Sequence, residues 1–177
     1  MSDFVHSDLD PWGFLECVQA DRDRYDGFNL LVAANDELLH YANVSDAITE
    51  LAPGVHGLSN HLLNTPWPKV ERGKAALRSL LAGDLDELVA GLFDALNDAG
   101  PAADKDLPRT GIPLEWERRL ASIFIATPDY GTRASTVVLM ERTGKINLTE
   151  RNFGPDGIPG DTRALQFSAA SGAWTFV

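Results

Sequence analysis

The sequence predicts an α+β protein with antiparallel sheets, on three observations. Apolar or alternating β-type runs come in pairs joined by short polar turns, and amphipathic helical patterns lie between those pairs. There is no regular alternation of strand and helix of the kind that builds a parallel sheet. The 177 residues are 44% hydrophobic and 23% charged, as in an ordinary globular protein, so we predict a single domain over residues 1–177.

The first predicted element is a helix of about twelve residues that begins at Asp10 and ends near Arg24. The carboxylate of Asp10 can cap free backbone amides, and proline is tolerated at the next position, the first of the helix. One face then carries three apolar side chains: Phe14, Leu15 and Val18. Because Cys17 lies mid-helix among apolar positions, we expect it in the core and not as a nucleophile.

A buried β-hairpin is predicted next. The apolar runs 28–34 and 37–42 are separated by Asn35-Asp36, a two-residue reversal, with His40 packed or at a sheet edge. Asp26-Gly27 predicts the turn before the hairpin. Residues 55–59 are also strand-like, and the prolines at 66 and 68 then forbid regular strand pairing and lead into a helix.

Two amphipathic helices are predicted in the middle of the chain, the first from Lys69 to Gly83 and the second from Asp84. Their apolar stripes are Val70, Ala76, Leu77, Leu80 and Leu81 in the first, and Leu85, Leu88, Leu92, Phe93 and Leu96 in the second. Residues 100–113 have loop composition, and residues 114–125 begin as a helical turn.

The C-terminal third is β-rich. Residues 134–153 form the clearest hairpin of the sequence, with β-branched strands joined at Arg142–Lys145. Residues 154–163 are predicted to be a turn-rich loop, and residues 164–177 are strand-like.

Charge and composition exclude several classes of function. A net charge of −11 repels phosphate backbones, so no nucleic-acid partner is expected. No apolar run is long enough for stable membrane insertion, and the first residues do not resemble a signal peptide, so we predict a cytoplasmic protein. One cysteine cannot form an internal disulfide. The oligomeric state stays open.

Residues 54–74 are predicted to form one wall of a small-molecule site. Ser59-Asn60 follows the strand-like run and precedes the bend with the two prolines. The Asn60 amide can donate to a developing oxyanion or orient a carbonyl; the alternative is that it satisfies backbone groups of a turn. Trp67 is a substrate platform or a hydrophobic plug, and Lys69 is a candidate anion ligand, although it is a single lysine beside a helix start.

A second candidate group lies at residues 130–139. Gly131 permits a close backbone approach, and Thr132 and Arg133 enter an apolar strand. Because an unpaired buried guanidinium is costly, Arg133 must find an anion, a carboxylate or solvent. A structural salt bridge to Glu117 or Glu150 is the alternative to a ligand-binding role.

Known motifs give no further support for a reaction. His56 and His61 are too far apart on an extended segment for a metal pair and have no third ligand nearby, so no metal site is predicted. Motifs of nucleotide binding, serine hydrolysis and zinc proteolysis do not occur in the sequence.

Four segments together resemble a known family. Residues 25–32, 54–74, 107–125 and 130–151 are similar, in order and spacing, to the middle and C-terminal portions of the NRDE family, also called the transport and Golgi organisation protein 2 family. This resemblance implies an Ntn-hydrolase-like fold, a four-layer αββα sandwich with two stacked antiparallel sheets.

The family's opening segments have no counterpart here. Members begin with Met-Cys and carry an Asn-Arg-Asp-Glu signature followed by Gly-Gly-Thr-Trp; residues 33–37, AANDE, are only a lookalike because they follow a later strand of the family. We therefore expect a truncated chain, the C-terminal two-thirds of an NRDE-family domain, with N-terminal strands missing.

A looser likeness to choloylglycine hydrolases assigns roles to single residues. By this resemblance Asn60 is an oxyanion donor and Arg133 organises an N-terminal cysteine nucleophile. The same two segments supply the predicted substrate contacts: Ser59, His61, Trp67, Lys69 and Thr132.

The family resemblance leaves three functions open. The first is a cytosolic, non-catalytic or catalytically incomplete protein that handles a small molecule, with haem or a lipid-like compound as the carried ligand and no certain cofactor. The alternative is an Ntn-type amidohydrolase whose N-terminal cysteine nucleophile is absent from this chain. The third is a marginal fragment without activity.

Overall fold

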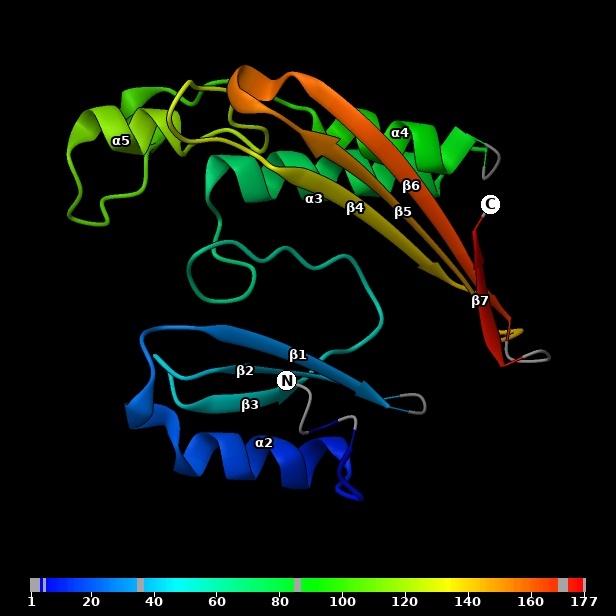
Figure 1. The fold of residues 1–177 in the computed structure, drawn as a ribbon. Helices are drawn as coiled ribbons and strands as arrows, with labels where there is room; N and C mark the ends of the chain where they lie inside the picture. The colour runs from blue at the N-terminus through cyan, green and yellow to red at the C-terminus, as the bar shows by residue number, and fades with distance from the viewer. Residues whose placement is uncertain (1–3, 5, 35–36, 85–86, 169–171, 177) are drawn as a thin grey trace. The chain divides into compact units, whose positions relative to one another are not determined.

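The computed structural model describes residues 4, 6–34, 37–84, 87–168 and 172–176. The chain divides into two compact units, residues 1–65 and 66–177 (Figure 1). Each unit combines helices with one antiparallel sheet, which confirms the predicted α+β class. Whether the two units form one domain depends on how they associate, so the single domain over residues 1–177 stays a prediction. Within the described ranges, every helix is too short or too polar to cross a membrane.

The first unit packs one helix on a three-stranded sheet. Helix α2 (Pro11–Ala20) is followed by a 3₁₀ turn at Arg22–Arg24, and strands β1 (Asn29–Ala34), β2 (Glu37–Ala42) and β3 (Ala47–Glu50) pair in the order β1-β2-β3. The side chain of Asp10 accepts a hydrogen bond of 2.7 Å from the backbone amide of Gly13, which confirms the predicted cap. The predicted helix to near Arg24 is present in two parts, since α2 ends at Ala20 and the 3₁₀ turn ends at Arg24.

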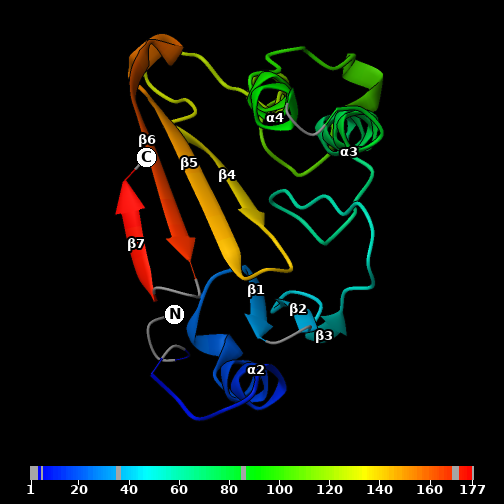
Figure 2. The same ribbon diagram turned by 90° about the vertical axis from the view of Figure 1, so that its right-hand side faces the viewer.

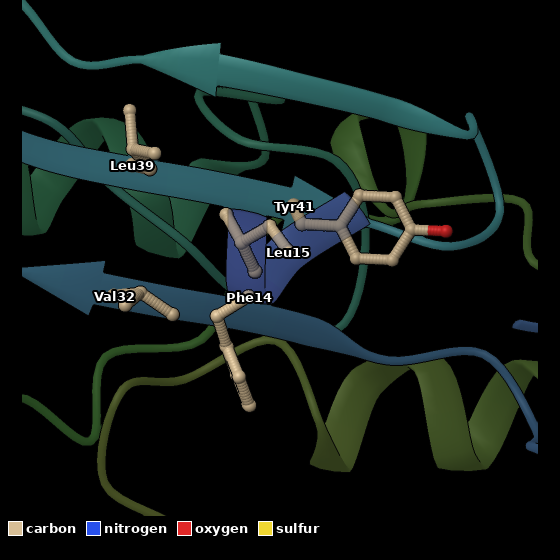
Figure 3. Close-up of a cluster of buried hydrophobic side chains, with 5 residues drawn as sticks. All are labelled: Phe14, Leu15, Val32, Leu39 and Tyr41. Carbon is tan, nitrogen blue, oxygen red and sulfur yellow. The ribbon is translucent and has the colours of Figure 1, made fainter. Parts of the chain in front are cut away.

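The core of the first unit lies between α2 and the sheet (Figure 3). Phe14 and Leu15 on the helix pack with Val32 on β1 and with Leu39 and Tyr41 on β2. Leu15, Leu39 and Tyr41 are fully buried.

The apolar face predicted for α2 is confirmed, since Val18 also packs against this core. The prediction that Cys17 lies in the core is wrong, because its side chain is exposed. Two residues along an α-helix rotate the side chain by about 200°, which places Cys17 on the far side from buried Leu15.

The predicted hairpin of β1 and β2 is confirmed, with Leu30 opposite Tyr41 and Val32 opposite Leu39. The predicted reversal at residues 35–36 lies outside the described residues. Burial of the hairpin is only partial, since Leu31 and Leu38 are exposed. The strand predicted at residues 55–59 is wrong, because that stretch has no regular structure. The third strand of the sheet is instead β3, which follows the turn after β2.

The second unit begins with helices α3 (Pro68–Leu81), α4 (Leu88–Leu96) and α5 (Leu114–Arg119), with a 3₁₀ turn at Asp104–Asp106. Strands β4 (Ala134–Met140), β5 (Lys145–Phe153), β6 (Pro159–Ser168) and β7 (Ala173–Phe176) follow in that order across one antiparallel sheet. A 3₁₀ turn at Pro155–Gly157 joins β5 to β6. Figure 2 shows α3 and α4 side by side next to β4, and α4 contacts β4.

Both predicted helices of this unit are present, although their apolar stripes are only partly buried. Val70, Leu88 and Phe93 are buried, whereas Leu81 is 53% exposed at the end of α3, and Leu85 lies outside the described residues. The hairpin predicted at residues 134–153 is confirmed. The loop predicted at residues 154–163 is wrong in its second half, because Pro159 begins β6 and Thr162 pairs with Arg151.

The two faces of the second sheet differ. Val137 is buried on the face toward α4, where the guanidinium of Arg151 lies 3.9 Å from the ring centroid of Phe93. The alternate positions of β4 lie on the other face, where Val138 and Met140 are exposed.

Candidate functional site

A pocket of about 500 Å³ lies in the first unit, on the sheet face that points away from α2. Asn29 and Ala42 are opposite each other on β1 and β2, and they face away from the helix because Leu30 and Tyr41, their neighbours, face it. The loop after β3 supplies the opposite wall. The full lining is Gly27, Phe28, Asn29, Ala42, Val44, Ser59, Asn60, His61 and Leu62.

Asn64 gives the loop its shape. Its backbone is left-handed (φ 58°), its amide donates to the Gly57 carbonyl at 2.7 Å, and its side-chain oxygen accepts from the Gly57 amide at 2.9 Å. The Asn64 side chain also bonds to Nδ1 of His56 at 3.1 Å, while Nε2 of His56 bonds to the Ala52 carbonyl at 2.8 Å. These bonds fold residues 57–64 back on themselves, which is why the strand predicted at residues 55–59 does not form.

Asn29 joins the loop to the sheet. Its side-chain amide donates to the His61 carbonyl at 3.0 Å, and its side-chain oxygen lies 2.8 Å from Nε2 of His40. Since Asn29 uses its NH₂ group on His61, its oxygen accepts from a protonated Nε2 of His40. His40 is buried, as the sequence predicts for a packed histidine, and burial lowers its pKa. Asn29, which lines the pocket, is therefore held by hydrogen bonds to the loop and to a buried imidazole whose charged form burial disfavours.

The rim beside Phe28 is fixed by Asn43. The Asn43 side chain accepts from the Phe28 amide at 2.7 Å and donates to the Asp26 carbonyl at 3.0 Å. This Asx-type bonding holds the bend at Tyr25–Gly27, which agrees with the turn predicted at Asp26-Gly27.

Three of the predicted site residues come together in this pocket: Ser59, Asn60 and His61. Asn60 is exposed, and its side chain has no hydrogen bond to any residue that the structure describes. The alternative interpretation, in which Asn60 satisfies the turn, is wrong because Asn64 does so. Nδ1 of His61 lies 2.8 Å from the Thr65 hydroxyl.

The other predicted residues belong to the second unit. Trp67 precedes the first residue of α3, and the ammonium of Lys69 donates to the Leu120 carbonyl at 2.9 Å and lies 5.8 Å from the Trp67 ring centroid. Burial lowers the pKa of Lys69. The lysine is thus bonded within its own unit, beside the indole.

Thr132 and Arg133 lie directly before β4. The Thr132 hydroxyl accepts from the Ile125 amide at 3.0 Å, and the Thr132 amide donates to the Ile125 carbonyl at 2.8 Å. Gly131 lies so close to Ile125 that an added Cβ would be 2.7 Å from its carbonyl oxygen, which confirms the predicted close approach.

The predicted structural salt bridge of Arg133 does not form within the described part of the chain. Arg133 is exposed, Glu117 accepts bonds of 2.8 and 2.7 Å from the amide and hydroxyl of Thr110, and Glu150 accepts from Thr136 at 3.0 Å. The guanidinium is therefore available to an anionic group.

The pocket of the first unit is suited to holding a largely apolar molecule with a polar group. Phe28, Ala42, Val44 and Leu62 supply apolar surface, and Asn60 supplies an amide that can donate and accept. In the described ranges, no three His, Cys, Asp or Glu side chains are grouped so as to hold a metal ion.

Comparison with known proteins identifies the family. The family model of Transport and Golgi organisation 2 matches residues 1–155. The chain is 34% identical over 194 residues to the Transport and Golgi organization protein 2 homolog of Bos taurus, covering 97% of this chain and 67% of the relative. It is 32% identical over 187 residues to the Homo sapiens homolog, covering 95% of this chain and 66% of the relative.

A third relative gives the same result. The Transport and Golgi organization 2 homolog of Mus musculus is 31% identical over 170 residues, covering 86% of this chain and 60% of the relative. The chain thus spans about two thirds of the length of these relatives. This chain belongs to the Transport and Golgi organisation 2 family, which is the family named NRDE in the sequence analysis.

Proposed function

We propose that this chain is a cytosolic, non-catalytic or catalytically incomplete protein that binds a largely apolar small molecule, haem or a lipid-like compound, in the pocket between β1, β2 and the loop after β3. The observation that carries the proposal is the pocket itself, with a free Asn60 amide among apolar walls. Its volume of about 500 Å³ falls within the range of roughly 300–1,000 Å³ that is typical of small-molecule sites.

Preorganisation of the pocket supports ligand binding. Asn64, Asn29 and Asn43 fix the loop, the floor and the rim through bonds that are already made within the protein. A ligand then pays little conformational entropy for ordering the site. Asn60 is the exception, since its amide keeps its hydrogen-bonding capacity for the ligand.

The first test is ligand titration with two pocket variants. Haemin is followed by its Soret band, and a fluorescent long-chain acyl amide by its emission. We expect saturable micromolar binding of at least one probe, weakened about tenfold by Val44→Trp, which fills the pocket from an exposed position, and several-fold by Asn60→Ala. Leu58→Trp, at an exposed position outside the lining, is the matched control. A flat response to both probes would overturn the proposal.

An amidohydrolase remains the second candidate because the free amide of Asn60 is what an oxyanion donor needs. The one cysteine of this chain, Cys17, is on α2 and is not among the residues that line this pocket. Mass spectrometry of N-acyl amides incubated with the protein tests this candidate. Product that accumulates with wild type but not with Asn60→Ala would support hydrolysis, and no product would exclude it for this chain.

For the whole fold we propose the Ntn-hydrolase-like αββα sandwich, on the family resemblance. Each unit by itself supplies a helical layer and an antiparallel sheet, as this arrangement requires. The role of Arg133 as an organiser, and of Trp67, Lys69 and Thr132 as ligand contacts, belongs to the same proposal. Arg133→Ala is expected to reduce ligand binding more than thermal stability, since the side chain has no protein partner among the described residues.

A further inference from the structure

A second pocket, of about 570 Å³, lies in the first unit beside α2. Its apolar lining comes from the segment before the helix, from the helix itself, and from the bend that leads into β1: Leu9, Phe14, Val18, Tyr25, Phe28 and Leu30. Phe28 and Asn29 line both pockets, so they form the wall between them. The proposed function uses only the first pocket.

Aromatic rings shape the walls of the second pocket. Phe14 packs against Phe4 with ring centroids 4.9 Å apart, and Tyr25 meets Phe28 edge to face at 6.0 Å. Tyr25 nevertheless stays 59% exposed. An exposed tyrosine held against a phenylalanine gives an opening with an apolar ring and a polar tip, a common arrangement where an apolar ligand enters from water.

Three polar side chains of this pocket, those of Ser7, Asp21 and Asn29, are already bonded within the protein. Ser7 donates to the Phe4 carbonyl at 3.0 Å, and the carboxylate of Asp21 forms an ion pair with Arg24 at 3.0 Å. The side-chain amide of Asn29 is bonded to His40 and to the His61 carbonyl. A charged ligand would thus have to displace an existing bond, while an uncharged apolar one would not.

We propose that this second pocket binds an uncharged, hydrocarbon-rich small molecule, independently of the first pocket. The ligand class is a single aliphatic chain or ring system with at most a hydroxyl group. Asp21 in the lining disfavours a carboxylate ligand through repulsion between like charges. Burial of apolar surface against Leu9, Phe14, Val18 and Leu30 provides the affinity.

The alkylation rate of Cys17 can report whether a ligand occupies this pocket. It is the only cysteine of the chain, it is exposed, and it lines this pocket but not the first. The experiment measures the rate at which N-ethylmaleimide alkylates Cys17, with and without 1-decanol below its solubility limit. We expect saturating 1-decanol to slow alkylation about tenfold, and decanoate at the same concentration to slow it far less.

Two matched variants locate the effect. Leu9→Trp fills the second pocket and should abolish the protection by 1-decanol, whereas Val44→Trp fills only the first pocket and should leave it unchanged. Both positions are exposed, at 46% and 76%, so the fold should tolerate both changes. If circular dichroism shows that Leu9→Trp is unfolded, Leu30→Phe replaces it, with the same expectation.

Several results would overturn the proposal. They are alkylation that 1-decanol does not slow, protection that persists in the folded second-pocket variant, equal protection by decanoate, and protection that Val44→Trp removes. The last result would assign the decanol site to the first pocket. Failure of both haemin and the acyl amide to bind, with protection of Cys17 intact, would instead contradict only the function proposed for the first pocket.

Discussion

Asn64 has a left-handed backbone conformation and bonds both its main chain and its side chain to Gly57. Asparagine tolerates this conformation better than other residues with a side chain, because its short amide can bond locally. The pocket wall at Ser59–Leu62 lies inside the loop that these bonds close. Single-residue geometry at Asn64 therefore determines where the Asn60 amide is placed.

Asn64→Ala should destabilise the protein by about 1–3 kcal/mol, since alanine is strained at this φ and the Gly57 amide loses its partner. Asn64→Gly should destabilise the protein less than Asn64→Ala does, because glycine adopts the left-handed backbone conformation without strain. Urea denaturation measures the loss, and hydrogen exchange at the Gly57 amide localises it. Asn60→Ala is the control and should change stability by less than about 0.5 kcal/mol. Equal losses for Asn60→Ala and Asn64→Ala would contradict this account.

His40 makes the stability of the protein depend on pH. Burial lowers its pKa in the folded state below the ordinary value of 6.5. The unfolded chain then binds the proton more readily. The contribution of His40 to the free energy of unfolding is therefore constant well above pH 6.5 and decreases as the pH falls below that value.

His40→Gln removes this dependence and keeps a side-chain NH₂ group for Asn29. Urea midpoints of wild type and variant are compared from pH 7.5 to 5. Both midpoints should fall below pH 6.5, because the two proteins share every other titrating group. The wild-type midpoint should fall more steeply, because only the wild type also has to protonate His40 on unfolding. Parallel curves for the two proteins would show that His40 does not titrate differently on folding.

At the level of single residues, the sequence drew attention to Ser59, Asn60 and His61 because they precede a proline-stiffened bend, and all three line the pocket. Their roles as site residues stay predictions. Asn29 and His40 were missed as site residues because their mutual bond, and the bond from Asn29 to His61, join positions 11 and 32 residues apart. The only local signal was a polar residue at the start of an apolar run.

Among the secondary-structure elements, those determined by local chemistry were predicted and those determined by pairing were not. The cap at Asp10 and the β4–β5 hairpin follow from residues close in sequence. Residues 55–59 have strand-like composition but pair with no strand that the structure describes. Pro159–Ser168 contains a proline and a glycine, yet it pairs along β5. Pro159 is tolerated because it is the first residue of its strand.

Two glycines of the second unit should respond oppositely to alanine. At Gly131 an added Cβ would meet the Ile125 carbonyl oxygen at 2.7 Å, so Gly131→Ala should cost about 1–3 kcal/mol. Gly73 lies within α3, and its Cβ would meet only the tip of Ile123 at 3.5 Å. Gly73→Ala should therefore stabilise by about 0.5–1 kcal/mol.

Thermal and urea unfolding of both glycine variants provide the measurement. A neutral Gly131→Ala would mean that the backbone beside Ile125 moves aside without strain.

For the molecule as a whole, net charge dominates the electrostatics. The 26 acidic residues outnumber the 15 basic ones, and the sequence pI is near 4.6. The ion pairs described are mostly between exposed side chains, such as Arg118 with Asp104 and Arg24 with Asp21. Pairs of this kind contribute little to stability, so repulsion among unpaired carboxylates outweighs them at neutral pH.

Added salt should therefore stabilise this protein. The screening length falls from about 30 Å at 0.01 M to about 10 Å at 0.1 M ionic strength, which removes repulsion between carboxylates on distant surfaces. If this screening raises the free energy of unfolding by about 1 kcal/mol, the Tm should rise by about 2–4 °C for a chain of this size. Differential scanning calorimetry at pH 7.5, between 10 and 300 mM NaCl, measures the change. The same titration near pH 4.6 is the control: the net charge there is close to zero, so the rise in Tm should disappear. A Tm that falls with salt at pH 7.5 would instead mean that the exposed ion pairs outweigh the repulsion.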